Sequence, residues 1–210
     1  MGIYERKQRE KEQRKSEILE AARNVFSKKG FNSATMEEIA SQAELSPGTL
    51  YLYFKNKEEL HTSLSIEILK HLVKEIQKAV ELDITIEEKV ERFMEVFIEM
   101  YDYDSNILIN LFHLQSGETL KNLSEEVLEQ ITTYSTLSHR AIVDVIRQGI
   151  EQGIFIDEHP VALADILWAS YSGIVLWVGS KRLLDDNKDF VKSTLRTAFQ
   201  ILHRGLKKNN

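Results

Sequence analysis

The stretch TMEEIASQAELSPGTLYLYFKNKEEL, residues 35–60, contains three helix starts in close succession. Thr35, Ser46 and Asn56 each offer a side-chain oxygen that can cap the free amide groups of a first helical turn. A glutamate follows Thr35 and Asn56 by three residues, as in a capping box, and a proline follows Ser46 at the first helical position. Two short helices joined by a tight turn and braced by a preceding helix form a helix-turn-helix, so the stretch predicts this motif.

A longer helix is predicted directly before the motif, because apolar residues recur there at the spacing of one helical face. Gly30 follows that helix as a stop with a left-handed backbone. Residues 1–15 are polar and mixed in charge, and we expect a frayed arm there. The apolar face consists of Ile18, Leu19, Ala22, Val25 and Phe26.

The charge distribution sets the first quarter of the chain apart. Residues 1–57 contain 11 Lys and Arg against 8 Asp and Glu, a formal charge of +3, whereas the whole chain carries −6. The remaining residues therefore carry −9, since −6 − 3 = −9. This distribution fits a small DNA-facing head on an acidic body, and it equally fits a charged, solvated first helix.

The composition favours helices throughout. With 2 Pro and 9 Gly among 210 residues, helix breakers are scarce, and apolar residues recur at helical spacing after the motif. We expect an all-α protein of about nine helices. A three-helix helix-turn-helix head would occupy residues 1–57, and a helical body for ligand binding and dimerisation would occupy residues 58–210.

Several classes of protein are disfavoured. The absence of cysteine excludes disulfides, thiolate metal sites and a cysteine nucleophile, and it fits the reducing cytoplasm. No signal peptide and no run of about 18 apolar residues is evident, so we expect no membrane span. The 6 His show no metal-binding spacing, and no phosphate loop or nucleophile elbow appears. We therefore expect a cytoplasmic protein that is not an enzyme, without catalytic residues, metal or cofactor.

The second helix of a helix-turn-helix enters the major groove of DNA. Leu50 and Phe54 lie four residues apart and should face inward, so Thr49, Tyr51 and Tyr53 should face outward or sideways. An exposed tyrosine offers its hydroxyl to a phosphate and its ring edge to a thymine methyl group. The alternative is that the two tyrosines cover the small core of the head.

Two further residues suit an approach to DNA. Gly48 has no side chain, so the start of its helix can come close to the DNA. Lys57 lies at the N-terminus of the next helix, where free amide groups and the helix dipole already attract a phosphate.

The segments ILEAARNVFSKKGF, residues 18–31, and TMEEIASQAELSPGTLYLYFKNKEEL resemble the DNA-binding head of the TetR family of transcriptional regulators. The resemblance covers residues 16–60, and its motifs are highly specific to the family. It implies that one group of residues holds phosphates, namely Thr35, Thr49, Tyr53 and Lys57. It also implies that a second group approaches the DNA, namely Ser46, Pro47, Gly48 and Tyr51.

The segment ALADILWASYSGIVLWVG, residues 162–179, is apolar almost all round, so a helix there must be covered on every side. A second copy of the chain could cover one face, as in the four-helix bundle of the resembled family, and a buried central helix of a monomer is the alternative. Ala169 and Gly173 would permit close helix approach. The expected partners on the last helix are Phe199, Leu202 and Leu206.

Large aromatic residues recur on the middle helices. Such residues usually form ordinary core, but as a set they can also line an adaptable cavity. The resemblance implies a small-molecule site, and the scarcity of charge nearby favours a lipophilic ligand. The candidate residues are Phe93, Phe97, Tyr101, Phe112, His113, Tyr134, Trp168 and Tyr171.

Together these expectations describe a homodimeric repressor of a palindromic operator that is released by a small lipophilic effector. Its partners would be double-stranded DNA, a second copy of the chain and the effector. The alternative is a constitutive regulator, or an activator, that has no small-molecule ligand.

Overall fold

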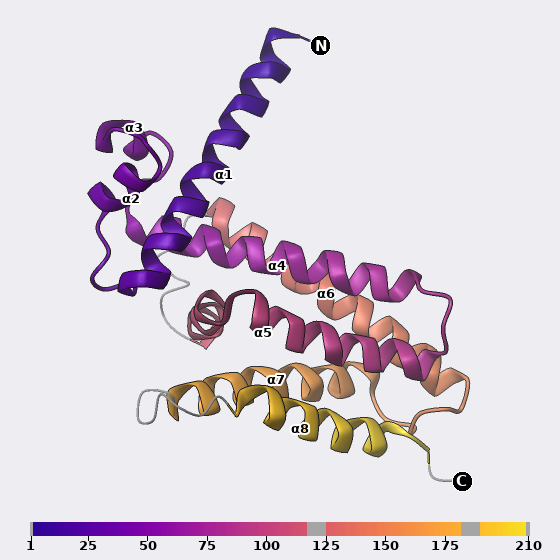
Figure 1. Ribbon diagram of the computed structural model, residues 1–210. Helices are drawn as coiled ribbons and strands as arrows, with labels where there is room; N and C mark the ends of the chain where they lie inside the picture. The colour runs from indigo at the N-terminus through magenta and orange to yellow at the C-terminus, as the bar shows by residue number, and fades with distance from the viewer. Residues whose placement is uncertain (1, 117–124, 182–189, 209–210) are drawn as a thin grey trace. The chain divides into compact units, whose positions relative to one another are not determined.

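The computed structural model describes residues 2–116, 125–181 and 190–208, and these ranges form eight helices (Figure 1). The expected all-α fold is confirmed. The helices are α1 (Ile3–Lys29), α2 (Met36–Gln42), α3 (Pro47–Tyr51), α4 (Lys57–Glu81), α5 (Ile86–Ser116), α6 (Glu125–Glu151), α7 (Pro160–Lys181) and α8 (Val191–Leu206).

The chain divides into two compact units, Met1–Ser65 and Ile66–Asn210, which we call the head and the body. α4 starts in the head and continues into the body, so the division falls within a helix and not in a linker. The expected domain limits, 1–57 and 58–210, stay a prediction.

The first helix is longer than the sequence indicates. The sequence predicts a frayed arm over residues 1–15, but α1 begins at Ile3 and runs without a break for 27 residues. No glycine or proline interrupts it, and side-chain pairs one turn apart, such as Arg14 with Glu17 at 2.7 Å, stabilise the exposed half. The helix ends where expected, at Gly30, whose φ of 76° is readily adopted only by glycine.

The head packs around a small apolar core. Its fully buried members come from all four of its helices, namely Ile18, Ala22, Ile39, Ala40, Leu50, Leu60 and Leu64. α2 and α3 are joined by a tight turn in which Glu44 takes a positive φ of 56°. α3 ends at Tyr51 and has only 5 residues. Its last turn tightens, because the amides of Tyr53 and Phe54 both donate to Leu50 O, at 3.0 and 3.1 Å.

In the body, α5 packs against α6, α7 and α8, and α7 packs against both α6 and α8 (Figure 1). α5 is broken at Asp104, where φ is −162° and ψ is 88°. Asp104 Oδ1 accepts a hydrogen bond from Ile107 N at 3.1 Å, so this side chain caps the second half of α5.

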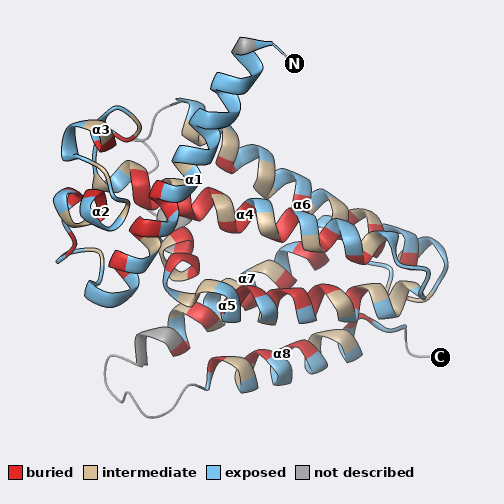
Figure 2. Cartoon of the chain, turned by 45° about the horizontal axis from the view of Figure 1, so that its top comes forward, coloured by how far each residue is buried: buried red, intermediate tan, exposed pale blue. Residues whose placement is uncertain are grey.

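α7 differs from the other helices in its composition. Contrary to the expectation that no such run occurs, its residues Pro160–Val178 are long and apolar enough to cross a membrane, with a mean hydropathy of 1.7. This is weak evidence for a span, because a core helix of a globular protein passes the same test. Only 33% of that window is buried within this chain, which leaves apolar surface uncovered. α8 is amphipathic, with buried residues along one side and exposed residues along the other (Figure 2).

Candidate nucleic-acid interface and effector pocket

A reciprocal pair of hydrogen bonds fixes the start of α2. Glu38 N donates to Thr35 Oγ1 at 3.2 Å, and Thr35 N donates to the Glu38 carboxylate at 3.2 Å, which confirms the predicted capping box. Lys29, at the end of α1, donates to the same carboxylate. That hydrogen bond is the largest cause of the lowered pKa of Glu38; burial opposes the shift, and the backbone hydrogen bond from Thr35 adds to it. The ion pair thus joins α1 to α2.

Two hydroxyl groups meet at the exposed start of α3. Ser46 Oγ accepts a hydrogen bond from Thr49 N at 3.1 Å and lies 2.8 Å from Thr49 Oγ1. Pro47 occupies the first helical position, where it leaves no amide unpaired. A hydroxyl has one donor and two acceptor sites, so both groups keep capacity to bind a phosphate or a base edge.

The side chains after this start alternate between core and surface. The inward orientation predicted for Leu50 and Phe54 is confirmed, since both are buried. Tyr51 is 47% exposed and Tyr53 is half-buried, so neither tyrosine is fully buried in the core of the head. Leu52 is 82% exposed, and sequence reasoning missed it. The sequence does contain a signal for this exposure, because Leu52 lies two residues from both Leu50 and Phe54 and therefore on the opposite side of the helix.

Gly48 does not serve the packing of the head. A Cβ atom added at this position would meet only Ser46 Oγ, at an ordinary contact distance of 3.9 Å. The head would therefore accept alanine here without a clash. A glycine that the fold does not require leaves room for something outside the chain.

Lys57 is held within the head. Its ammonium donates to Phe31 O at 2.7 Å, Ala34 O at 3.0 Å and Asn32 O at 3.3 Å, and it lies 4.6 Å from the Phe31 ring centroid. These contacts use all three donors of the ammonium to hold the loop between α1 and α2. The expected phosphate contact stays a prediction, and it would require the ammonium to exchange these carbonyl partners.

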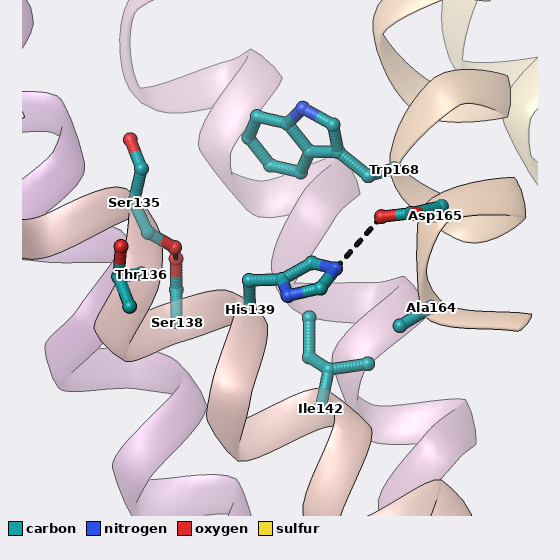
Figure 3. A pocket seen from close by; sticks show the side chains of 8 residues that line it. All are labelled: Ser135, Thr136, Ser138, His139, Ile142, Ala164, Asp165 and Trp168. Carbon is teal, nitrogen blue, oxygen red and sulfur yellow. Dashed lines mark hydrogen bonds and ion pairs between the residues drawn. The ribbon is translucent and has the colours of Figure 1, made fainter. Parts of the chain in front are cut away.

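The body contains a pocket of about 330 Å³ between α6 and α7 (Figure 3). His139 on α6 and Asp165 on α7 meet across it, with His139 Nε2 2.9 Å from Asp165 Oδ1. Figure 3 shows three hydroxyl side chains gathered on one side of His139, with the Trp168 ring on the other side of the pocket. The eight lining residues are Ser135, Thr136, Ser138, His139, Ile142, Ala164, Asp165 and Trp168.

The aromatic residues expected to line a cavity instead pack on one another. Phe97 stacks on Tyr171 with ring centroids 4.7 Å apart, and Phe112 meets Trp168 edge-on at 5.6 Å. Tyr171 is 1% exposed, and among the described residues its hydroxyl has no hydrogen-bond partner. Burial, and to a smaller extent Tyr101, raises the pKa of Tyr171 well above its ordinary value. The cluster therefore contains a buried polar group that a ligand could satisfy.

Only Trp168 belongs to both the expected ligand set and the observed pocket. Phe93, Phe97, Tyr101, Phe112 and Tyr171 are buried, Tyr134 is half-buried, and the side chain of His113 lies outside the described residues. Sequence reasoning missed the hydroxyl residues and the pair of His139 with Asp165. The hydroxyls could have been found as a polar run on the apolar face of α6, but nothing in the sequence pairs two residues 26 positions apart.

The outer side of α7 carries the uncovered apolar surface. Ala169 and Gly173 are exposed there, and a Cβ added to Gly173 would have no neighbour within 4 Å; their part in a dimer interface stays a prediction. On α8, Phe199 and Leu206 are buried within the body and Leu202 is half-buried, so their part in a subunit interface stays a prediction. The exposed apolar residues that sequence reasoning missed are Ile166, Trp177 and Ile201.

Comparison with known proteins agrees with this geometry at the head. Residues 18–64 match the family model described as bacterial regulatory proteins of the tetR family. The head is therefore similar to the DNA-binding head of the TetR family. The match spans α2 and α3 whole, together with the end of α1 and the start of α4.

Among curated relatives, the uncharacterised HTH-type regulator YfiR of Bacillus subtilis is 46% identical over 50 residues, 24% of each chain. The first such alignments cover 24% to 31% of the relatives' own length. Solved TetR-family structures match nearly the whole fold. PfmR of Thermus thermophilus has a TM-score of 0.71 at 23% identity, over 91% of this chain and 99% of its own. FadR of Bacillus subtilis, in complex with stearoyl-CoA, has a TM-score of 0.67 at 22% identity, over 91% and 98%.

Proposed function

We propose that this protein is a homodimeric transcriptional repressor of the TetR family that binds a palindromic operator and is released by a small lipophilic effector. The observation that carries the proposal is the outer surface of α3. There the head presents Gly48, whose missing side chain the fold does not require, and the paired hydroxyls of Ser46 and Thr49. It also presents the exposed side chains of Tyr51 and Leu52. A surface of this kind, on a capped helix-turn-helix, suits the major groove of DNA.

The exposed side chains divide by chemistry. Ser46 and Thr49 offer hydroxyls to phosphate oxygens, and Tyr51 and Leu52 offer apolar contact to thymine methyl groups. Lys57 supports this surface indirectly, because its ammonium holds the loop that precedes the N-cap of α2. Thr35 and Tyr53 extend the phosphate contacts on either side.

The short recognition helix requires a second head. α3 has 5 residues, and so small a helix buries too little surface for specific binding by itself. In a dimer, two such helices reach half-sites about 34 Å apart, one turn of DNA. The uncovered side of α7 with Ile166, Gly173 and Trp177, beside Ile201 of α8, fits a second copy of the chain. Apolar surface of this extent on a globular protein is typical of an interface.

The pocket between α6 and α7 suits a small, largely apolar effector. Ile142, Ala164 and Trp168 provide apolar contact, while the hydroxyls and the pair of His139 with Asp165 provide hydrogen bonds. The likeness to FadR with stearoyl-CoA supports a lipophilic ligand of acyl type. None of the eight lining residues is lysine or arginine, so nothing here neutralises a phosphate group. We therefore favour a lipophile with an uncharged or cationic polar end.

Selection of random duplex DNA by the purified protein tests the DNA-binding part of the proposal. We expect enrichment of an inverted repeat whose half-sites are separated by about one helical turn. Sedimentation of the selected complex should give an even number of protein chains for each duplex. Failure to enrich any sequence, with a protein that is folded and dimeric, would contradict the proposed function.

A further inference from the structure

The first half of α1 extends beyond the core of the head. Burial begins at Ile18, and the described residues before it are exposed or, for Lys15 alone, half-buried (Figure 2). An exposed helix of this length is only marginally stable in water unless local pairs or a partner support it. The question is therefore which side chains of the extension already have partners along the helix.

The acidic residues of this extension all have local partners. Glu5 accepts a hydrogen bond from Gly2 N at 3.1 Å, and Glu10 pairs with Arg6 at 3.5 Å. The remaining two carboxylates are held in the same way, Glu12 by Gln8 at 3.4 Å and Glu17 by Arg14 at 2.7 Å. Each of the four carboxylates of this extension thus has a hydrogen-bond or ion-pair partner along the helix.

Three lysines have no such partner. Lys7, Lys11 and Lys15, which we call the lysine stripe, are spaced four residues apart and so lie on one face of α1. Within the part of the chain that the structure describes, none of them forms an ion pair or a side-chain hydrogen bond. Like charges one turn apart repel each other and destabilise the helix. An anionic partner that binds the three lysines would offset this repulsion.

The stripe is in register with the packed face of α1. Ile18 follows Lys15 by three residues and Ala22 follows Ile18 by four, which continues the same row into the core. Both apolar residues are fully buried, and α1 packs against α2. The stripe therefore projects from the side of α1 on which the helix-turn-helix lies.

We infer that the lysine stripe is a second DNA-binding surface, which binds the phosphate backbone of the duplex beside the half-site that α3 contacts. The inference rests on the proposed DNA-binding function. Successive lysines are about 6 Å apart along the helix, and their flexible stems let each ammonium reach a separate phosphate. A duplex offers a regular row of such charges. An anionic membrane is the less suitable partner, because the stripe lacks the apolar face with which surface helices enter a bilayer.

The test compares two double variants with the same change in charge. Lys7→Gln with Lys11→Gln removes two of the three charges of the lysine stripe, and Arg6→Gln with Arg9→Gln removes two charges from the opposite side of the helix. Each is titrated by fluorescence anisotropy against the duplex selected by the wild-type protein, between about 50 and 200 mM salt. Glutamine and lysine have similar helix propensities, and circular dichroism checks that α1 persists.

We expect the lysine double variant to lower the slope of log affinity against log salt by about 1.8 for each bound head, and the arginine variant to leave it nearly unchanged. Lys7→Arg with Lys11→Arg should retain the slope of the wild type. Equal salt slopes in the two double variants, or equal losses of DNA affinity, would contradict the proposed role of the lysine stripe and leave the proposed function intact. Loss of binding to anionic phospholipid vesicles with unchanged DNA binding would also overturn it. Absence of DNA binding by the wild-type protein would overturn both proposals.

Discussion

At the scale of single residues, Lys57 shows how one ammonium can hold a loop in place. We predict that Lys57→Ala lowers the free energy of unfolding by about 1–3 kcal/mol, because carbonyls of the loop lose a charged donor. Urea unfolding measures this loss. Lys55→Ala is the matched control, since Lys55 is exposed and lies two residues away. A variant of Lys57 as stable as the control, but with a smaller salt slope of DNA binding, would instead favour a direct phosphate contact.

A residue can also connect two elements through its charge, as Glu38 does. In the folded protein its pKa lies below the ordinary value of 4.5, chiefly because of the hydrogen bond from Lys29. The unfolded chain therefore binds more protons near this range, so the contribution to stability is present above about pH 4.5 and is lost as the pH falls through the folded pKa.

We predict that Glu38→Gln makes the acid loss of stability shallower, as measured by urea unfolding between about pH 3 and 7. Glu37→Gln is the control, because Glu37 lies in the same first turn of α2 without the contact to Lys29. If both variants lose stability with the same pH profile, the charge on Glu38 is not what joins α1 to α2.

At the scale of helices, the outer side of α7 carries the prediction of assembly. Gly173 is exposed with no neighbour within 4 Å, so the body itself has room for a larger residue. In a dimer, Gly173→Arg would place an unpaired charge between packed helices, at a cost of several kcal/mol. We predict a folded monomer by analytical ultracentrifugation, with helix content retained and operator binding lost.

The control for this variant is Gln148→Arg, which adds the same side chain to an exposed position on α6. It should remain dimeric. A dimeric Gly173→Arg variant that still binds DNA would place the subunit interface elsewhere on the chain.

The helices differ in how far the sequence predicts them. The starts of α2, α3 and α4 were predictable because each has its own local cap, and these caps are present. The prediction of a frayed arm is wrong, because the polar residues before Ile18 stabilise one another along a helix that packs against no core. The break at Asp104 and the pairing of His139 with Asp165 depend on tertiary packing, which no local pattern encodes.

The ligand site shows the same limit. Aromatic composition predicts a cluster but not whether rings fill it or line a cavity, and here Phe97 and Tyr171 stack on each other. The pocket instead forms beside this cluster, with Trp168 as the shared residue. Only the relative placement of α6 and α7, set by many weak contacts, decides between these arrangements.

At the scale of the whole molecule, α4 is the element that belongs to both units. In the body, Lys70 of α4 lies over the Tyr134 ring at 5.6 Å, and Tyr134 directly precedes Ser135 of the pocket. His71 stacks on Tyr103 at 4.6 Å, next to the break in α5 at Asp104. An effector that moves α6 can therefore bias the position of α4.

We predict reciprocal coupling between effector and operator. If an effector weakens DNA binding by a factor typically between about 5 and 150, operator DNA must weaken effector binding by the same factor. Calorimetric titration of a lipophile that raises the melting temperature, with and without operator, measures this. Tyr134→Ala, which removes the ring under Lys70, should reduce the coupling. Equal effector affinity in both titrations would contradict the switch and favour a constitutive regulator.

The central claim is that DNA occupies the outer face of α3, and the operator affinity of Gly48→Ala tests it most directly. Alanine fits the head without a clash and favours helix, so the variant should be at least as stable as the wild type. Gly205→Ala, at an exposed helical glycine of the body, is the control. We predict that Gly48→Ala alone weakens binding to the selected duplex by about tenfold or more. Unchanged affinity in a folded, dimeric Gly48→Ala protein would contradict the claim.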